Sequence, residues 1–194
     1  MDVWLIAGLG NPGPGYARNR HNIGFRVVDE LATRTGARFS APARMRAEVA
    51  EGRLGPPGPD STRVVLLKSR TYMNDTGAAV AKAIGYYKVA PERLVAVHDE
   101  LDLDLGRLRV KFGGGDNGHN GLKSIRRSIT SGDYYRVRVG VGRPPGRQDP
   151  ADFLLSDFAA RELDEAAIQT DRAADAVESL IAHGLERTQS AFNS

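Results

Sequence analysis

The sequence contains no cysteine and no long apolar run. The lack of thiols excludes disulfides, cysteine nucleophiles, iron–sulfur clusters and thiolate zinc sites. A membrane span needs about 18 or more consecutive apolar residues, so we expect none. The first apolar run, residues 3–8, follows an acid and stops at Asn11-Pro12, unlike a signal peptide. These absences predict a cytoplasmic protein with no membrane partner.

The chain has 194 residues, the length of one domain. No repeat or linker divides it, so we expect a single domain over residues 1–194, with 185–194 as a frayed tail. The net charge of +3 hides an asymmetry. Residues 1–150 carry 24 basic and 15 acidic side chains, whereas residues 151–194 carry 3 and 9. A basic body indicates a polyanionic partner, although an ordinary solvated surface explains the same counts.

Strand and helix patterns alternate along the chain. Short apolar or alternating runs predict strands, and apolar residues at helical spacing predict helices, with Gly36 and Gly184 as stops. The two predicted strands on either side of the turn-rich residues 55–60 are expected to form a hairpin. We therefore predict an α/β three-layer sandwich with a mixed, mostly parallel sheet. The predicted strands are 3–8, 47–54, 63–68, 94–98, 107–112 and 136–141, and the helices 22–36, 76–87, 121–129 and 163–184.

A glycine-rich string, GLGNPG at residues 8–13, matches the dinucleotide-binding fingerprint. That fingerprint requires the glycines to open a helix whose amides hold a pyrophosphate. Pro12 and Pro14 prevent a helix there, because proline lacks a donor and disfavours helical backbone before it. We interpret the string as a turn and expect no dinucleotide.

Polar side chains collect after the predicted strands, where open α/β sheets bind ligands. Taken singly, Asn11 is typical of a turn, Asn22 and Asn74 of helix N-caps, and His21 of a cap or surface group. Asp99 ends a buried strand and is placed to hold an imidazole. Residues 111–121, with five glycines, favour a loop that binds a ligand over a plain linker. We expect residues 113–118 and 142–150 to be mobile. The polar groups lie at residues 11–22, 68–74, 98–102 and 111–121.

Three histidines and two aspartates are candidate zinc ligands: His21, His98, His119, Asp99 and Asp102. They lack the local spacing of a zinc motif, and their neighbours are asparagines, which are poor metal ligands. No serine lies in a nucleophile elbow. We therefore expect no metal and no cofactor, and a general base that activates water.

Four motifs together resemble bacterial peptidyl-tRNA hydrolases: GLGNPGPGYARNRHNIGF from residue 8, TYMNDTGAAV from 71, HDELDL from 98 and GGGDNGHNGLKSI from 113. The resemblance covers nearly the whole chain, and the RPPGR stretch from residue 143 is similar to actinobacterial members. It implies a monomeric hydrolase that cleaves the ester between an N-blocked peptide and tRNA.

The resemblance also implies roles for individual residues. His21 takes the place of the general base, Asp99 of its acidic partner, and Asn11 of the contact to the peptide backbone. Side chains that line the substrate cleft would be Tyr16, Tyr72, Met73, Asn74, His119 and Asn120. Asn120 and loop amides would hold the water or stabilise the oxyanion.

Lys111 and Arg138 stand where the family clamps a tRNA phosphate. At two places the sequence differs from the pattern usual in that family. Asp116 and Asn117 replace small residues and bring a negative charge near the tRNA path, and Tyr72 stands where phenylalanine is frequent. The alternative function is an RNA-binding module of the same fold that lacks hydrolysis, which has the same basic surface. A metal hydrolase is the third alternative.

Overall fold

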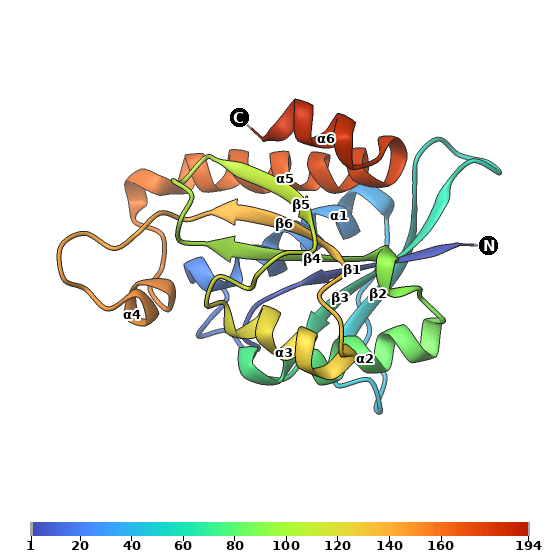
Figure 1. Ribbon diagram of the computed structural model, residues 1–194, viewed down its shortest axis with the longest axis horizontal. Coiled ribbons are helices and arrows are strands. Elements are labelled where there is room, and N and C mark those ends of the chain that lie inside the picture. The colour runs from blue at the N-terminus through green and yellow to red at the C-terminus, as the bar shows by residue number, and fades with distance from the viewer. Residues whose placement is uncertain (1, 194) are drawn as a thin grey trace.

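The computed structural model describes residues 2–193 and has a six-stranded sheet between two layers of helices (Figure 1). The first and last residues of the predicted domain lie outside the described part. The strands are β1 (Val3–Gly8), β2 (Ala47–Leu54), β3 (Thr62–Ser69), β4 (Leu94–Glu100), β5 (Leu108–Phe112) and β6 (Tyr135–Gly140). The helices are α1 (Ile23–Thr35), α2 (Thr76–Tyr87), α3 (Asn120–Ile129), α4 (Pro150–Leu154), α5 (Leu163–His183) and α6 (Leu185–Phe192).

The strands lie in the order β2-β3-β1-β4-β6-β5. The central pairs, β3 with β1, β1 with β4 and β4 with β6, are parallel, and the two edge strands are antiparallel to their neighbours. The predicted mixed, mostly parallel sheet and the predicted hairpin are therefore confirmed. The parallel strands are buried on both faces, which explains their continuous apolar runs.

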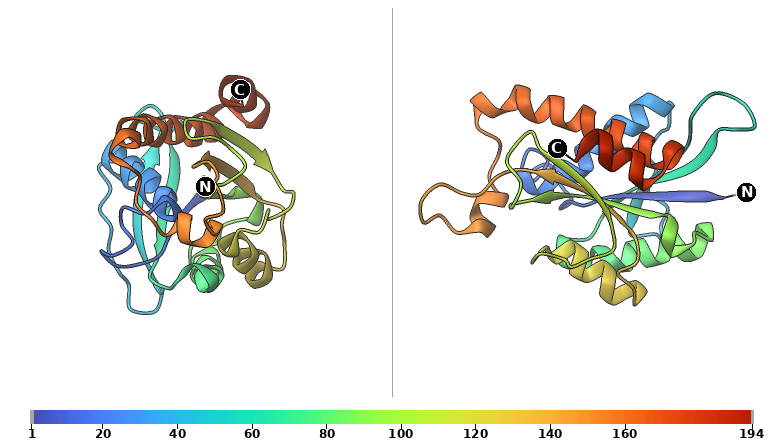
Figure 2. Two further views of the ribbon diagram at one scale, coloured as in Figure 1. Left: turned by 90° about the vertical axis from the view of Figure 1, so that its left-hand side faces the viewer. Right: turned by 45° about the horizontal axis from the view of Figure 1, so that its top comes forward.

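Helices α1, α5 and α6 cover one face of the sheet, and α2 and α3 cover the other (Figures 1 and 2). Successive residues of a strand point to opposite faces of the sheet, so they contribute in turn to the two hydrophobic cores beneath the two helix layers. Ile6 of β1 packs with Val27 and Val177 on the α1 and α5 side, whereas Leu5 packs with Val80 on the α2 side. No helix among the described residues is long and apolar enough to cross a membrane.

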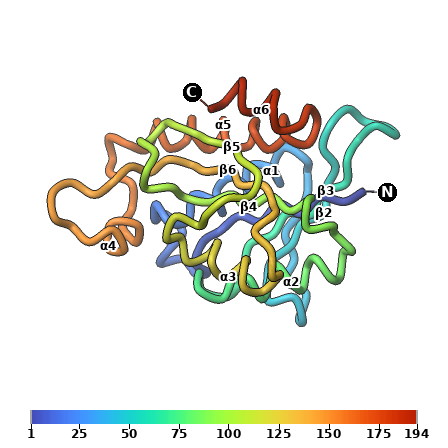
Figure 3. Tube along the Cα trace, viewed as in Figure 1, coloured from blue at the N-terminus to red at the C-terminus, as the bar shows by residue number. Residues whose placement is uncertain are grey.

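The expectation of a frayed tail over residues 185–194 is wrong for its described part. Helix α6 packs against β5 at the edge of the sheet (Figure 3). The Asn193 side chain accepts a hydrogen bond from Val110 N–H at 2.7 Å and donates one to Val110 O at 3.1 Å. Thr188 is fully buried. The edge strand offers unpaired main-chain groups, and the helix satisfies them. Ser194 lies outside the described residues.

The carboxyl ends of the parallel strands lie at one side of the molecule. The chain leaves β1 through a turn-rich loop at residues 11–19, and α1 begins only at Ile23. This agrees with the turn interpretation of the glycine string. At the same side lie the end of β4, the start of α3 and helix α4 (Figure 1).

Candidate active site

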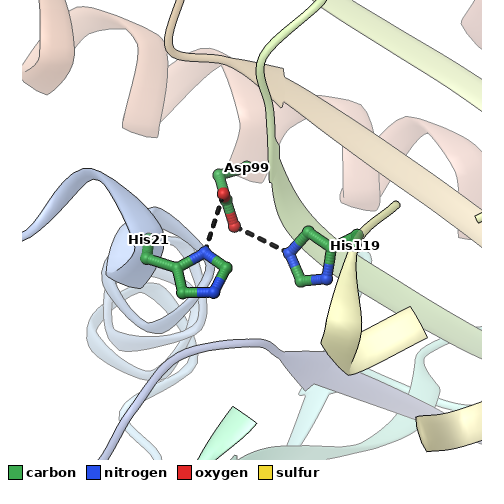
Figure 4. A group of neighbouring side chains, drawn as sticks. All are labelled: His21, Asp99 and His119. Atoms are coloured by element: carbon green, nitrogen blue, oxygen red, sulfur yellow. Dashed lines mark hydrogen bonds and ion pairs between the residues drawn. The ribbon is translucent and has the colours of Figure 1, made fainter. Parts of the chain in front are cut away.

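Two imidazoles share one buried carboxylate at this side of the sheet (Figure 4). His21 Nδ1 lies 2.8 Å from Asp99 Oδ2, and His119 Nε2 lies 2.8 Å from Asp99 Oδ1. Asp99 is 2% exposed, so both of its oxygens are used inside the protein. His21 comes from the turn before α1, Asp99 from β4 and His119 from the residue before α3.

Two glycines allow His21 to reach Asp99. A Cβ on Gly24 would lie 2.3 Å from Val97 O, and one on Gly8 would lie 2.4 Å from Gly24 O. No side chain fits there, so the first turn of α1 packs directly on β1 and β4. The start of α1 is thus held against β4, the strand that carries Asp99.

Helix α3 fixes the tautomer of His119. Its Nδ1 accepts hydrogen bonds from Gly121 N–H at 3.1 Å and Leu122 N–H at 3.4 Å, as an N-cap. Nδ1 is therefore unprotonated, and the proton on Nε2 donates to Asp99. A proton on Nδ1 would point at these two amide donors.

The ionised Asp99 stabilises the imidazolium form of His21 when that ring accepts a proton. Burial alone would lower the pKa of His21, but the charge and the hydrogen bond of Asp99 outweigh it and raise that pKa. Burial alone would raise the pKa of Asp99, yet His21 and His119 hold it well below its usual range. A base whose cation is stabilised by a fixed anion suits proton abstraction from water.

His98 lies behind this cluster and is not part of its proton chemistry. Its ring is 5.0 Å from that of His119, and its Nδ1 lies 2.8 Å from Asp99 O. Burial and the neighbouring His119 lower the pKa of His98 to about 3. The ring is therefore neutral near pH 7.

The ligand atoms of His21, Asp99 and His119 lie within 4.8 Å of one another, close enough to hold a metal. These atoms already bond to each other, and the remaining His119 nitrogen accepts from two amides. A cation would have to break these bonds. Asp102 points away to Asn117 and Arg143. This set of side chains is better suited to proton transfer than to metal binding.

A pocket of about 370 Å³ opens in front of His21. Six further residues predicted for the site line it together with His21 and Asp99: Asn11, Tyr72, Met73, Asn74, His119 and Asn120. Tyr16 does not line the pocket but packs edge-on against Tyr72, with ring centroids 6.0 Å apart. The structure thus brings together the motifs that are far apart in the sequence.

Asn11 is held in one orientation by its neighbours. Asn22 pairs with its main chain, accepting from Asn11 N–H and donating to Asn11 O, each at 2.9 Å. Met73 N–H donates to Asn11 Oδ1 at 2.8 Å. Among the described residues nothing accepts from Asn11 Nδ2, which is left as a donor toward the pocket.

Two N-cap interpretations are wrong. Asn22 stands at the N-cap position of α1, but its side chain makes no cap hydrogen bond because it is committed to Asn11. Asp75, not Asn74, precedes α2. Asn74 lies in a short 3-10 turn, exposed, with its side chain at the pocket.

Sequence reasoning missed one wall of the pocket. Helix α4 contributes Pro150, Ala151 and Leu154 to its lining, and Leu155 directly follows the helix. The sequence signal was weak, because α4 has only 5 residues within a polar connection. Figure 2 shows α4 standing out from the sheet at the end of a long loop.

Lys111 and Arg138 lie outside the pocket, on the antiparallel pair β5 and β6. In the register of this pair, Arg109 is opposite Arg138 and Lys111 is opposite Arg136. Like charges across a ladder repel, so this basic face needs counter-ions. Glu100 Oε2 lies 3.4 Å from Arg138 Nε and is buried.

Asp116 supplies the second counter-charge. Its carboxylate accepts from Arg126 Nε at 3.0 Å and from the fully buried Arg136 at 3.3 Å. The negative charge expected near the tRNA path is therefore turned inward and neutralised. Asn117 adopts φ +47 and donates to Glu100 and Asp102, while Arg143 also donates to Asp102. These bonds join the two loops expected to be mobile.

Comparisons with known proteins agree with this geometry. Residues 5–194 match the sequence profile of the family described as peptidyl-tRNA hydrolase. A peptidyl-tRNA hydrolase of Streptomyces coelicolor is 59% identical over 98% of this chain and 95% of its own. One of Cutibacterium acnes is 53% identical over 98% of both chains.

A solved structure shares the architecture. The crystal structure of peptidyl-tRNA hydrolase from Acinetobacter baumannii superposes with a TM-score of 0.89 and 33% identity, over 99% of this chain and 95% of that one. The profile, the relatives and the fold agree over nearly the full length, and this chain belongs to the peptidyl-tRNA hydrolase family.

Proposed function

We propose that this chain hydrolyses the ester bond between a peptide and the terminal ribose of tRNA, with His21 as the general base. The family supports the reaction, and one observation supports the role of His21. Among the described residues, nothing bonds to the second ring nitrogen of His21, which lines the pocket, whereas both nitrogens of His119 are hydrogen-bonded. The substrate is peptidyl-tRNA, and the reaction needs no cofactor.

The first step is proton abstraction from water. His21 Nδ1–H donates to Asp99, so its Nε2 carries a lone pair and accepts a proton from water while the water oxygen attacks the ester carbonyl carbon. Asp99 stabilises the imidazolium that forms. Rates gained by such a base are typically about 10²–10⁴-fold.

The tetrahedral intermediate needs donors for its oxyanion. Asn11 Nδ2 is available because Oδ1 is occupied by Met73 N–H. Asn120, the first residue of α3, lies at the same pocket and positions the water. Asn74 and Tyr72 line the side where the peptide enters, and Tyr16 supports Tyr72. Contacts of Asn11 to the peptide backbone would favour N-blocked substrates over free aminoacyl-tRNA.

Collapse of the intermediate breaks the bond between the carbonyl carbon and the ribose oxygen. That oxygen takes the proton from His21 Nε2, which restores the neutral base. The products are a peptide with a free carboxyl group and tRNA with a free hydroxyl group, so one water molecule is consumed. His119 keeps its hydrogen bond to Asp99 and holds the carboxylate in place.

The tRNA backbone would bind the basic face of β5 and β6. Lys111 has no ion-pair partner among the described residues, and Arg138 shares only Glu100. Burial and the neighbouring Arg138 and Arg136 lower the pKa of Lys111, which is the environment of a cation that lacks its counter-ion. A phosphate would supply that charge.

The decisive test is release of tRNA from N-acetylated aminoacyl-tRNA. Wild type should turn over the substrate, His21→Ala should lose nearly all activity, and the unacetylated substrate should react poorly. Near-normal turnover by His21→Ala would overturn the assigned role. Binding of tRNA by wild type without any release of product would instead support the alternative, an RNA-binding module.

A further inference from the structure

The residue next to the proposed base is an almost fully buried arginine. Arg20 is 6% exposed and lies in the 3-10 turn that carries His21. An ionised side chain is costly to bury unless its donors are satisfied. The proposed reaction does not use Arg20, so the reason for its burial lies in what it binds.

The partners of Arg20 come from α4 and from the segment that follows it. Its Nη1 donates to Ser156 Oγ at 2.5 Å and to Asp157 O at 2.8 Å, and its Nη2 donates to Glu162 at 2.8 Å. The guanidinium also lies over the Phe153 ring, 4.1 Å from its centroid. These residues are more than 130 positions away in the sequence.

The main chain reinforces this junction. Arg20 N–H donates to Ser156 O at 3.1 Å, and Asn19 Nδ2 donates to Asp157 Oδ1 at 2.8 Å. Phe153, beneath the guanidinium, belongs to α4 itself, whose neighbouring residues Leu154 and Leu155 line the pocket. The base and the apolar wall are therefore attached to each other through Arg20.

We propose that Arg20 is a positioning residue that holds α4 against the turn of His21, and thereby sets the distance between the catalytic base and the apolar wall. This inference rests on the proposed function. The aminoacyl residue joined to the ribose lies nearest the base, so its side chain meets Leu154 and Leu155. Loss of Arg20 would weaken binding of substrates with an apolar side chain there.

A planar fork explains why arginine occupies the site. Five N–H donors in fixed directions can bind carbonyls, a hydroxyl and a carboxylate at the same time, whereas lysine offers one compact ammonium. Arg20→Lys keeps the charge but loses the fork. Arg26→Lys is the matched control, because Arg26 approaches the neighbouring Phe158 ring at 5.8 Å and, in the part of the chain that the structure describes, makes no hydrogen bond to residues 153–162.

The experiment compares N-acetyl-leucyl-tRNA with N-acetyl-glycyl-tRNA. For Arg20→Lys we expect KM to rise about tenfold with the leucyl substrate and less than about twofold with the glycyl one, since only leucine buries apolar area on the wall. The kcat values and the pH profile should change little. Hydrogen exchange at residues 153–156 should accelerate while exchange in α3 stays unchanged. Arg26→Lys should behave as wild type.

Glu162→Gln gives a second, milder test, because it removes the only carboxylate paired with Arg20 among the described residues. Like Arg20→Lys, it should lower the preference for the leucyl over the glycyl substrate. It replaces Arg20→Lys as the test if that variant does not fold. An unchanged preference in the folded variants, or an equal loss of kcat on both substrates, would overturn the inference. Failure of wild type on both substrates would instead contradict the proposed function.

Discussion

Replacing Asp99 by asparagine should invert the proton arrangement at His21. The two amides of α3 oblige His119 to carry its proton on Nε2, so the new side chain must turn its oxygen toward His119. Its NH₂ group then faces His21 Nδ1 and donates to it. His21 must move its own proton to Nε2, where the proposed mechanism needs a lone pair. The variant keeps the shape of the site and loses the base.

The magnitude follows from the loss of the base. General-base catalysis contributes about 10²–10⁴-fold, and the corresponding change in the Ser-His-Asp triad lowers kcat about 10⁴-fold. We expect kcat of Asp99→Asn to fall about 10³-fold or more near pH 7. KM should stay within about threefold, since both carboxylate oxygens are bonded to imidazoles and neither is left for substrate.

The assay is single-turnover release of tRNA from N-acetylated aminoacyl-tRNA. Asp104→Asn is the control, because Asp104 is exposed and contacts neither histidine. A second variant tests the tautomer argument directly. In Asp99→Asn with His119→Ala the amide is free to turn its oxygen to His21, so the double variant should be at least about tenfold faster than Asp99→Asn alone. A slower double variant, or a loss below tenfold in Asp99→Asn, would refute the reasoning.

Four further outcomes are expected. The reactive form of His21 is unprotonated and its pKa is raised above 6.5, so kcat/KM should rise with pH to a plateau, with a midpoint above that value; a midpoint below it would contradict the role of the carboxylate. If Lys111 and Arg138 each contact a phosphate, log KM should rise with log salt at a slope of about 1.4–1.8, about tenfold between roughly 50 and 200 mM, and Lys111→Ala should reduce the slope by nearly 1. An unchanged slope would exclude that contact. Gly24→Ala should destabilise the fold by about 1–3 kcal/mol in thermal unfolding, because its Cβ would overlap Val97 O, whereas Gly85→Ala, with open space, should not. A chelator should leave turnover unchanged; loss restored by a divalent metal would favour the metal hydrolase.

The sequence predicted the fold well because its signals were local. Apolar periodicity and glycine stops placed nearly every strand and helix, and two of these spans, 47–54 and 76–87, coincide with β2 and α2. The prediction of a frayed tail at 185–194 was wrong because the contacts of this segment are not local. Leu185 and Phe192 pack against the core on the α5 side, and side chains of this segment bond to Val110. No local pattern reveals these contacts.

The candidate site was predicted in part. Motif resemblance pointed to His21, Asp99 and Asn11, and the strand ends explained why they gather. The sequence could not show that Asn22 clamps Asn11, since asparagine before a helix is equally typical of a cap. Nor could it show the counter-ion role of Glu100 or the wall formed by α4. These depend on contacts between segments that are far apart in the chain.

The packing of α6 on β5 also bears on aggregation while the chain is being synthesised. Until the last helix has been made, β5 presents an open edge, and such edges pair readily with other chains. A chain shortened before residue 185 should therefore collect in aggregates even though every residue proposed for catalysis is already present. We therefore expect α6, which takes no part in the proposed reaction, to protect this edge from pairing with other chains.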